Sequence, residues 1–425
     1  MVTVLAFLCT LWCSPCSVFG TAQAAWAAEK PQNRTQQSQK IVRSLDVPWG
    51  QDETRQLQPV EITAAGAERS CGPDYRQVTC LPGWSGEEAE NRYNVSGNLL
   101  VTNVLLEGSR VVVYVDLSAR KAYALGVIAP SLGAADAGCS SAVVDSGCIA
   151  YVCWANRAAD GFTAELRVFT PSTHIERRVW QQPASAPAGN PSSPGFLKDH
   201  VVMINSSKCE RSCNALFLLP LPVGPAKKVF PPPGKEGGIG EGHASHPYIV
   251  WTDISHFLPN VEVAFLDISG NAPAAPVSTA GVGDRYGARI KGSRVAWMDT
   301  RNDPQQGYWH RRNLDIYAKD LATGEEWAVC TNAAMQESPD VEGDIVVWTD
   351  YRNNDNPYPY PSKFATHSDV YAANVRTRKE WRLTKLPGLA SDVRIDGGRV
   401  FFRWMTDDKP PQIYMIDLKA RGIVP

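Results

Sequence analysis

Beyond about residue 90, apolar and polar residues follow one another in short runs that are separated by turn-forming residues. Within a run the large apolar side chains fall on every second position, as in Val295 and Trp297 or Val346 and Trp348. This period is typical of β-strands, and no stretch of comparable length shows a sustained helical period. The pattern therefore predicts an all-β chain made of many short strands.

Two windows of this pattern match position for position, residues 294–303 and 345–354. Their shared residues are a tryptophan, an aspartate and an arginine at fixed spacing: Trp297, Asp299 and Arg301 in the first window, Trp348, Asp350 and Arg352 in the second, and Trp251 with Asp253 in a shorter third copy. A recurring residue is usually structural, so we interpret the aspartate–arginine pairs as charge-assisted hydrogen bonds that join neighbouring repeats. We expect no catalytic role for them.

Weaker copies of the same template can be followed from residue 90 to the end of the chain, at intervals of roughly 50 residues. Each copy holds three or four strand-like runs, as a propeller blade does. The tryptophans would pack between blades, because one four-stranded sheet cannot bury both of its faces alone. The sequence predicts a single β-propeller of four-stranded antiparallel sheets over residues 90–425, with seven blades, or six as the alternative.

The chain begins with an apolar stretch that ends in small residues, among them Ala25 and Ala27. This pattern predicts a signal peptide over residues 1–27, with an uncleaved anchor as the alternative, and no other membrane span. Residues 28–89 have the composition of a polar linker and a turn-rich lead-in. The last repeat ends near Leu418 without a fourth strand, and we expect residues 59–63 to supply it. The protein is therefore expected to be exported, whether periplasmic, secreted or at the cell surface.

Three of the 11 cysteines lie in the predicted signal peptide, which leaves an even number. In an exported chain this favours disulfides, so we expect most of the remaining cysteines to be oxidised. Two pairs bracket polar turns and are predicted to form local bridges, Cys71 with Cys80 and Cys209 with Cys213. The sequence leaves the partners of four others open: Cys139, Cys148, Cys153 and Cys330. Zinc binding is the weaker alternative, because zinc sites favour closer cysteine pairs.

The charge balance argues against two classes of partner. The chain has 42 Lys and Arg residues against 44 Asp and Glu residues, a formal net charge of −2, and no long run of either sign. Nucleic acids and anionic membranes attract basic surfaces, so neither is expected as a partner. Phosphate-loop, dinucleotide and nucleophile-elbow motifs are missing from the sequence, and we predict no cofactor.

The clearest repeat carries a family resemblance. It runs from Ser338-Pro-Asp340 through Asp369-Val-Tyr371 to Lys379-Glu-Trp-Arg-Leu-Thr384. These residues resemble the TolB-like, WD-like Pro-Asp propeller repeats, most clearly over residues 284–418. Such repeats occur in periplasmic TolB and in many exported or cell-surface proteins. The resemblance therefore implies a propeller with a binding or scaffolding role rather than a reaction.

One motif could bind a metal ion. His243 and His246 form a His-x-x-His pair with Glu241 nearby. Metallopeptidases place such a pair on a helix with a glutamate between the histidines, whereas glycine and proline surround this pair. We therefore predict no metal site.

The most distinctive features are two aromatic insertions, residues 304–312 and 356–367, which interrupt neighbouring repeats at the same position. Such loops emerge on one face of a propeller, so we predict a binding face at one mouth of the channel that contains Tyr308, Trp309, His310, Arg311, Arg312, Tyr358, Tyr360 and His367. The expected ligand is a glycan or a peptide segment of a polysaccharide or protein partner. Packing of these aromatics against the ring is an equally weighted alternative.

These features favour a non-catalytic binding or scaffold protein. The rival interpretation is a propeller-fold glycan lyase or hydrolase, which would use carboxylates or histidines at the channel mouth. The residues available for that chemistry are Asp303, His310, Asp355 and His367. Basic side chains in both insertions favour an acidic ligand in either case.

Overall fold

The computed structural model describes residues 54–61, 76–77, 93–106, 109–126, 134–157, 161–182, 192–207, 213–221, 224–231, 238–254, 261–278, 282–303, 313–354, 367–406 and 409–424. The regular elements within these ranges are all β-strands, β1 to β30. No helix among the described residues has the length and apolar character needed to cross a membrane. The all-β class predicted from the sequence is confirmed.

Five sheets contain four antiparallel strands each, and the last of them takes a strand from the N-terminal region. In sheet order their strands are β12 (Ser192–Leu197), β13 (His200–Ser207), β14 (Cys213–Pro220) and β15 (Lys227–Phe230); β16 (Ile239–Ser245), β17 (Tyr248–Asp253), β18 (Glu262–Asp267) and β19 (Ala275–Pro276); β20 (Arg285–Lys291), β21 (Arg294–Asp299), β22 (Asp315–Asp320) and β23 (Glu326–Cys330); β24 (Gln336–Glu342), β25 (Ile345–Asp350), β26 (Asp369–Asn374) and β27 (Glu380–Arg382); and β28 (Leu389–Asp396), β29 (Arg399–Thr406), β30 (Lys409–Asp417) and β3 (Arg76–Gln77).

The remaining strands form one larger sheet. It contains β1 (Thr54–Gln56), β2 (Val60–Glu61), β4 (Asn94–Ser96), β5 (Leu99–Leu106), β6 (Ser109–Asp116), β7 (Lys121–Gly126), β8 (Ala134–Asp145), β9 (Cys148–Arg157), β10 (Gly161–Thr170) and β11 (Ile175–Gln181). Parallel pairing of Arg110 with Gly138 joins β6 to β8. This junction divides the sheet into two antiparallel groups, β4–β7 with β2 added to β7, and β8–β11 with β1 added to β11.

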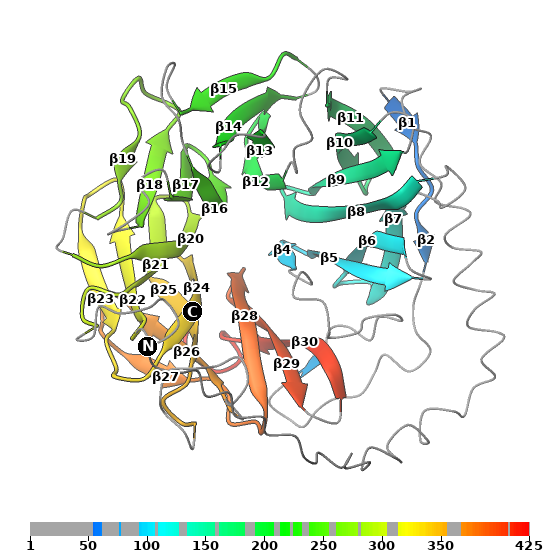
Figure 1. The fold of residues 1–425 in the computed structure, drawn as a ribbon. Coiled ribbons are helices and arrows are strands. Elements are labelled where there is room, and N and C mark those ends of the chain that lie inside the picture. Colours follow the sequence, from blue (N-terminus) through cyan, green and yellow to red (C-terminus); the bar gives the residue numbers. More distant parts are fainter. Residues whose placement is uncertain are drawn as a thin grey trace, which may run out of the picture.

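The five four-stranded sheets and the two groups of the larger sheet are arranged around a common centre (Figure 1). The innermost strands are β4, β8, β12, β16, β20, β24 and β28. Each contacts the next one along the chain, and β28 contacts β4, so the contacts form a closed cycle. Several hydrogen bonds cross the closure; among them, Tyr93 Oη donates to the backbone O of Asp392 at 2.6 Å, and Gly97 N donates to Asp396 Oδ2 at 2.8 Å.

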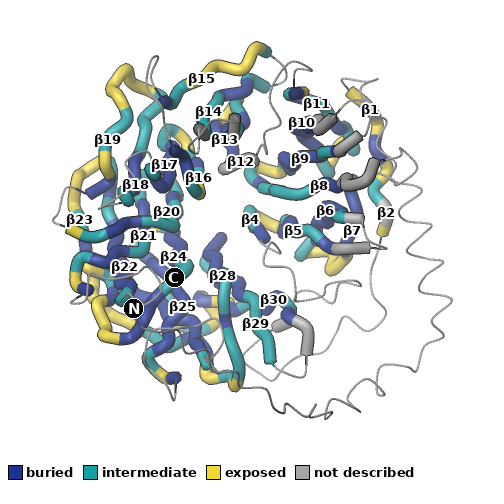
Figure 2. Tube along the Cα trace, in the orientation of Figure 1, coloured by how far each residue is buried: buried dark blue, intermediate teal, exposed yellow. Residues whose placement is uncertain are grey.

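The hydrophobic core lies between adjacent sheets. Trp251, Trp297 and Trp348 are fully buried, and each belongs to an apolar cluster that includes side chains of a neighbouring sheet. Burial of one such side chain contributes about 3 kcal/mol to the free energy of unfolding. Figure 2 shows the exposed residues mainly at the outer edges and turns. The predicted packing of the tryptophans between sheets is confirmed.

The N-terminal region completes the sheets in a different way from the one expected. Val60 and Glu61 do not close the ring at β30, because they form β2, which pairs with β7. The strand that pairs with β30 is β3. With β1 placed on β11, the short link from Gln56 to Val60 spans at most about 13 Å. The second strand therefore has to join the adjacent group, and only a later segment can reach β30.

One disulfide lies within the described residues, between Cys139 of β8 and Cys153 of β9. These two residues are cross-strand partners, and both are fully buried. Cys148 and Cys330 carry free thiols. The two bridges predicted from the sequence fall on Cys71, Cys80, Cys209 and the Cys213 side chain, which lie outside the described part of the chain. They stay predictions.

Candidate functional site

The predicted binding residues belong to two connections, the one from β21 to β22 and the one from β25 to β26. We call the end of the two sheets that carries these connections the insertion face. Of the predicted binding residues only His367 is described; the others, Tyr308, Trp309, His310, Arg311, Arg312, Tyr358 and Tyr360, lie outside the described residues, as does Asp355. The described geometry therefore concerns the foot of the two insertions.

At the foot of the second insertion, His367 belongs to a polar cluster around the fully buried Asp369. His367 Nε2 lies 3.0 Å from Asp369 Oδ2, and Arg382 Nη2 forms an ion pair with the same oxygen at 2.8 Å. Asn353 Nδ2 donates to Oδ2 at 3.0 Å, and Thr384 Oγ1 donates to Oδ1 at 3.0 Å. The side chains of His367 and Arg382 are 20% and 31% exposed. Asp369 thus fixes a partly exposed imidazole and guanidinium at the insertion face. We call these five residues the Asp369 cluster.

The β20–β23 sheet has a matching carboxylate, Asp315, at the start of β22. Asn302 Nδ2 donates to Asp315 Oδ2 at 2.7 Å, as Asn353 does in the other sheet. The other three partners of Asp369 have no equivalent around Asp315. Asn313, Ala328 and Cys330 stand at the positions of His367, Arg382 and Thr384. Asp315 is fully buried and its Oδ1 has no hydrogen-bond partner. Burial raises the pKa of Asp315 to about 6.

The repeated residues of the β20–β23 sheet form a hydrogen-bonded network beside this carboxylate. Asp299 Oδ2 accepts hydrogen bonds from Trp297 Nε1 at 2.9 Å and from Arg301 Nη2 at 2.6 Å. The Arg301 guanidinium lies 3.9 Å from the ring centroid of Tyr317, and its Nη1 donates to Glu326 at 2.9 Å. The arginine therefore links β21, β22 and β23 of one sheet.

The β24–β27 sheet repeats this network. Asp350 Oδ2 accepts from Trp348 Nε1 at 2.8 Å and from Arg352 Nη2 at 2.6 Å. Arg352 lies 4.3 Å from the ring centroid of Tyr371 and donates to Glu380 at 2.8 Å. In the third copy Trp251 Nε1 is buried without a hydrogen-bond partner.

The expectation that these pairs join neighbouring repeats needs correction. The aspartate–arginine bonds lie within one sheet, because the arginine follows its aspartate by two residues. Contact with the preceding sheet is made by the same guanidinium nitrogens: Arg301 Nη2 also donates to Ser278 at 3.2 Å, and Arg352 Nη2 also donates to Cys330 Sγ at 2.9 Å. A direct ion pair between sheets is formed by Arg285, which binds Glu262 at 2.7 Å.

Sequence reasoning missed a set of polar residues on the innermost strands. Three of their side chains accept a hydrogen bond from the backbone of the next innermost strand: Asn94 from Val144 at 3.2 Å, His243 from Ile290 at 3.3 Å, and Asp340 from Ile395 at 2.9 Å. Arg289 and Arg394 occupy the same register position on β20 and β28. A signal was available, because Arg289, Asp340 and Arg394 each stand three residues before a repeated glycine.

The His-x-x-His motif is part of this set. His243 lies in β16 and His246 in the turn that follows it. His243 Nδ1 accepts from Ile290 N, and burial lowers the pKa of His243 well below its usual value, with further lowering by the charges of Arg289 and Arg394. Within the described ranges no group of three His, Cys, Asp or Glu residues is arranged to hold a metal ion.

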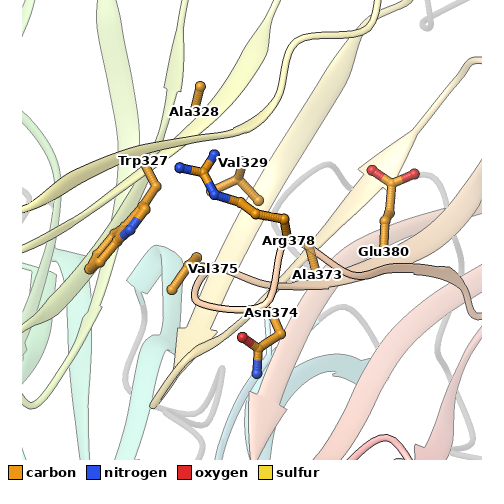
Figure 3. Close-up of a pocket in the computed structure, with 8 residues that line it drawn as sticks. All are labelled: Trp327, Ala328, Val329, Ala373, Asn374, Val375, Arg378 and Glu380. Carbon is orange, nitrogen blue, oxygen red and sulfur yellow. The ribbon is translucent and has the colours of Figure 1, made fainter.

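A cavity of about 240 Å³ lies between the β20–β23 and β24–β27 sheets (Figure 3). Trp327, Asn374, Arg378 and Glu380 are among the residues that line it. Two guanidinium groups lie over the Trp327 ring, those of Arg294 at 5.0 Å and of Arg376 at 5.1 Å from its centroid. The cavity lies by the outer strand β23 and the turn after β26, so it is not part of the insertion face.

The fold and the cluster together define a ring-shaped, all-β protein with a buried carboxylate and its polar partners at the start of β26. No protein-family model matches the chain, and no curated protein matches its sequence. Solved structures do match. An oligogalacturonate lyase from Vibrio parahaemolyticus aligns with a TM-score of 0.56 and 11% identity over 87% of this chain and 98% of the lyase.

Other solved structures give a similar result. An oligogalacturonate lyase in complex with manganese aligns with a TM-score of 0.54 and 14% identity, over 86% of this chain and 97% of the lyase. Acylaminoacyl peptidase of Pyrococcus horikoshii aligns with a TM-score of 0.53 and 12% identity, over 78% of this chain and 53% of the peptidase. A TolB from Agrobacterium tumefaciens aligns over 60% of this chain with a TM-score of 0.41.

These neighbours are propeller proteins, and at such low identity the likeness is one of fold alone. The chain therefore has a propeller-type, all-β fold of four-stranded antiparallel sheets. The propeller class expected from the repeats is confirmed at this level.

Proposed function

We propose that the chain is a single seven-bladed β-propeller and acts as an exported, non-catalytic binding or scaffold protein. The blade count is supported by the closed cycle of contacts among the seven innermost strands. Export is supported by the disulfide between Cys139 and Cys153, because disulfides persist mainly in oxidising compartments.

The ligand that we propose carries carboxylate groups and binds at the insertion face. The Asp369 cluster is the observation that carries this proposal, because it presents a partly exposed guanidinium and imidazole held from below by a buried carboxylate. A planar guanidinium matches a carboxylate in shape and charge. Tyr308, Trp309, Tyr358 and Tyr360 would add flat contact area for a sugar or peptide backbone.

Binding is favoured over catalysis by how the described groups at this face are used. Asp299 and Asp350 are fully buried and hydrogen-bonded to tryptophan and arginine side chains of their own sheets. His367 is held by Asp369, whose oxygens have further partners. The buried carboxylates cannot reach a reacting atom, as a general acid or base must, and we assign the partly exposed His367 to ligand contact.

The test is retention of the full chain on two immobilised acidic ligands, oligogalacturonate and an oligoglutamate peptide, with neutral cellulose oligosaccharide as reference. We expect retention on an acidic ligand and at least tenfold weaker binding for Arg382→Gln. Arg376→Gln is the matched control, because its side chain is 43% exposed and lies in the turn at the other end of the same sheet. Equal binding by wild type, R382Q and R376Q would contradict the proposal.

The second candidate function is a propeller-fold glycan lyase or hydrolase. It is favoured by the oligogalacturonate lyase neighbours, which this chain matches over nearly their whole length. Incubation of the full chain with oligogalacturonate, with and without added manganese, tests it by the absorbance of an unsaturated product and by reducing ends. Product formation that is lost in Asp303→Asn and His367→Gln variants would replace the binding proposal by this one.

A further inference from the structure

The centre of the ring holds a buried arginine without an acidic partner. Arg394 lies on β28, the innermost strand of its sheet, and is 6% exposed. Its Nη1 donates to the backbone O of Val393 at 2.7 Å, and its guanidinium lies 5.8 Å from the ring centroid of Tyr93. Arg394 Nε has no hydrogen-bond partner, and the guanidinium forms no ion pair with a described carboxylate. A buried cation in this state is costly unless another group completes its contacts.

The charge of Arg394 acts on residues from other parts of the ring. With Arg289 of β20 it adds to the burial that lowers the pKa of His243 on β16. The same two arginines oppose the burial that raises the pKa of Asp340 on β24. β16 and β28 belong to sheets that are not adjacent, and both are innermost strands of the ring (Figure 1).

The carboxylate beside this centre is already bonded to the backbone. Asp340 Oδ2 accepts from Ile395 N at 2.9 Å, and Oδ1 accepts from Val341 N at 2.9 Å. The His243 ring is neutral, since its Nδ1 accepts from Ile290 N. Arg394 therefore acts on a carboxylate whose two oxygens already accept hydrogen bonds from the backbone.

We propose that the ring centre between β16, β20, β24 and β28 binds a small anion that carries carboxylate or phosphate oxygens. Arg394 Nε would be its main donor, and Arg289 would supply a second positive charge. Guanidinium N–H groups match the oxygens of these anions in geometry. The near-complete burial of Arg394 limits the bound group to a few atoms. This site does not depend on the proposed function of the insertion face.

Calorimetric titration of the full chain at constant ionic strength tests the proposal, with inorganic phosphate and acetate as separate probes. We expect one anion to bind per chain. Binding of phosphate but not acetate identifies a free oxyanion as the natural ligand, whereas binding of acetate identifies the carboxylate of an organic ligand. If neither anion binds, ordered water satisfies Arg394 and the proposal is wrong.

Three variants make the test specific. Arg394→Met should abolish anion binding and raise the melting temperature in anion-free buffer, because it removes a buried cation that lacks a counter-charge. Arg394→Lys keeps the charge and loses the Nε donor, so it should bind at least tenfold more weakly. Arg403→Met is the matched control: Arg403 lies on the next strand and pairs with Asp392 at 3.2 Å, so its loss should lower the melting temperature and leave anion binding intact. Binding by R394M as tight as that of the wild type would overturn the proposal.

Discussion

The β20–β23 and β24–β27 sheets are close copies that differ around one buried carboxylate. Both keep the network of tryptophan, aspartate, arginine and tyrosine that holds their strands together. At the start of the third strand, however, Asp369 has four polar partners and Asp315 has one hydrogen-bond partner. The repeat preserves the contacts that stabilise the sheet, while residues at the foot of the insertions vary. Around Asp369 the variation introduces His367 and Arg382, which is why we propose ligand contact at the β24–β27 sheet.

The largest effect is expected from breaking the shared network. Asp350→Ala removes the acceptor of Trp348 Nε1 and of Arg352, and leaves both donors buried or partly buried. We expect it to lower the free energy of unfolding by about 3 kcal/mol in urea denaturation. Asp344→Ala is the control, since this 41% exposed carboxylate pairs with Arg294 in a turn and should cost less than about 1 kcal/mol. Similar losses in both variants would contradict the structural role.

A second prediction concerns the same substitution at the two matching carboxylates. Asp369→Asn weakens the ion pair with Arg382 and should destabilise the protein by about 2 kcal/mol at pH 7. Asp315→Asn removes a buried charge whose Oδ1 lacks a partner, and should stabilise the protein by about 2 kcal/mol at pH 8. Effects of the same sign at both positions would remove the distinction between the two sheets.

The pH dependence sharpens this contrast. The pKa of Asp315 is raised from 3.8 to about 6, so the folded protein binds the proton more tightly than the unfolded chain does. The resulting stability is fully present below about pH 4 and is lost as the pH rises through about 6. The gain from Asp315→Asn should therefore shrink below about 1 kcal/mol at pH 4. A gain that does not change with pH would show that Asp315 is not the titrating group.

A smaller effect is expected from restoring a missing partner. Cys330→Thr places a hydroxyl where Thr384 stands in the other sheet, and should supply a donor to Asp315 Oδ1. We expect the apparent pKa of Asp315 to fall toward 3.8 and the stability at pH 8 to rise by about 1 kcal/mol. The substitution also removes the Cys330 Sγ that accepts from Arg352, so a melting curve of Cys330→Val, which loses the thiol and adds no hydroxyl, serves as control.

Much of the fold could be predicted from the sequence, because alignment of the repeats shows which positions are equivalent in each sheet. Alignment of Trp297 with Trp348 was enough to locate the buried positions between sheets. The strand that closes the ring could not be predicted, because β3 has only two residues and no distinctive pattern. The bridge between Cys139 and Cys153 could not be predicted either, because it depends on the register of β8 against β9.

The candidate site was less accessible to sequence reasoning. Its aromatic residues are conspicuous by composition, but the Asp369 cluster joins residues from three segments of the chain that the pairing of β26 with β25 and with β27 brings together. Arg382 and Thr384 carry no signal until Asp369 is known to be buried. The burial of Arg394 on the innermost strand β28 could not be predicted, because a lone arginine in a strand is ordinarily exposed.

The central claim, that the insertions form a binding face on a rigid ring, is tested most directly by replacing Trp309 and Tyr360 together with alanine. The measurement pairs the melting temperature with retention on immobilised oligogalacturonate and oligoglutamate. We predict that the melting temperature is nearly unchanged and that retention on the acidic ligand is lost, because our proposal assigns these side chains to ligand contact and not to the core. A double variant that unfolds, or that binds as well as the wild type, would contradict the account.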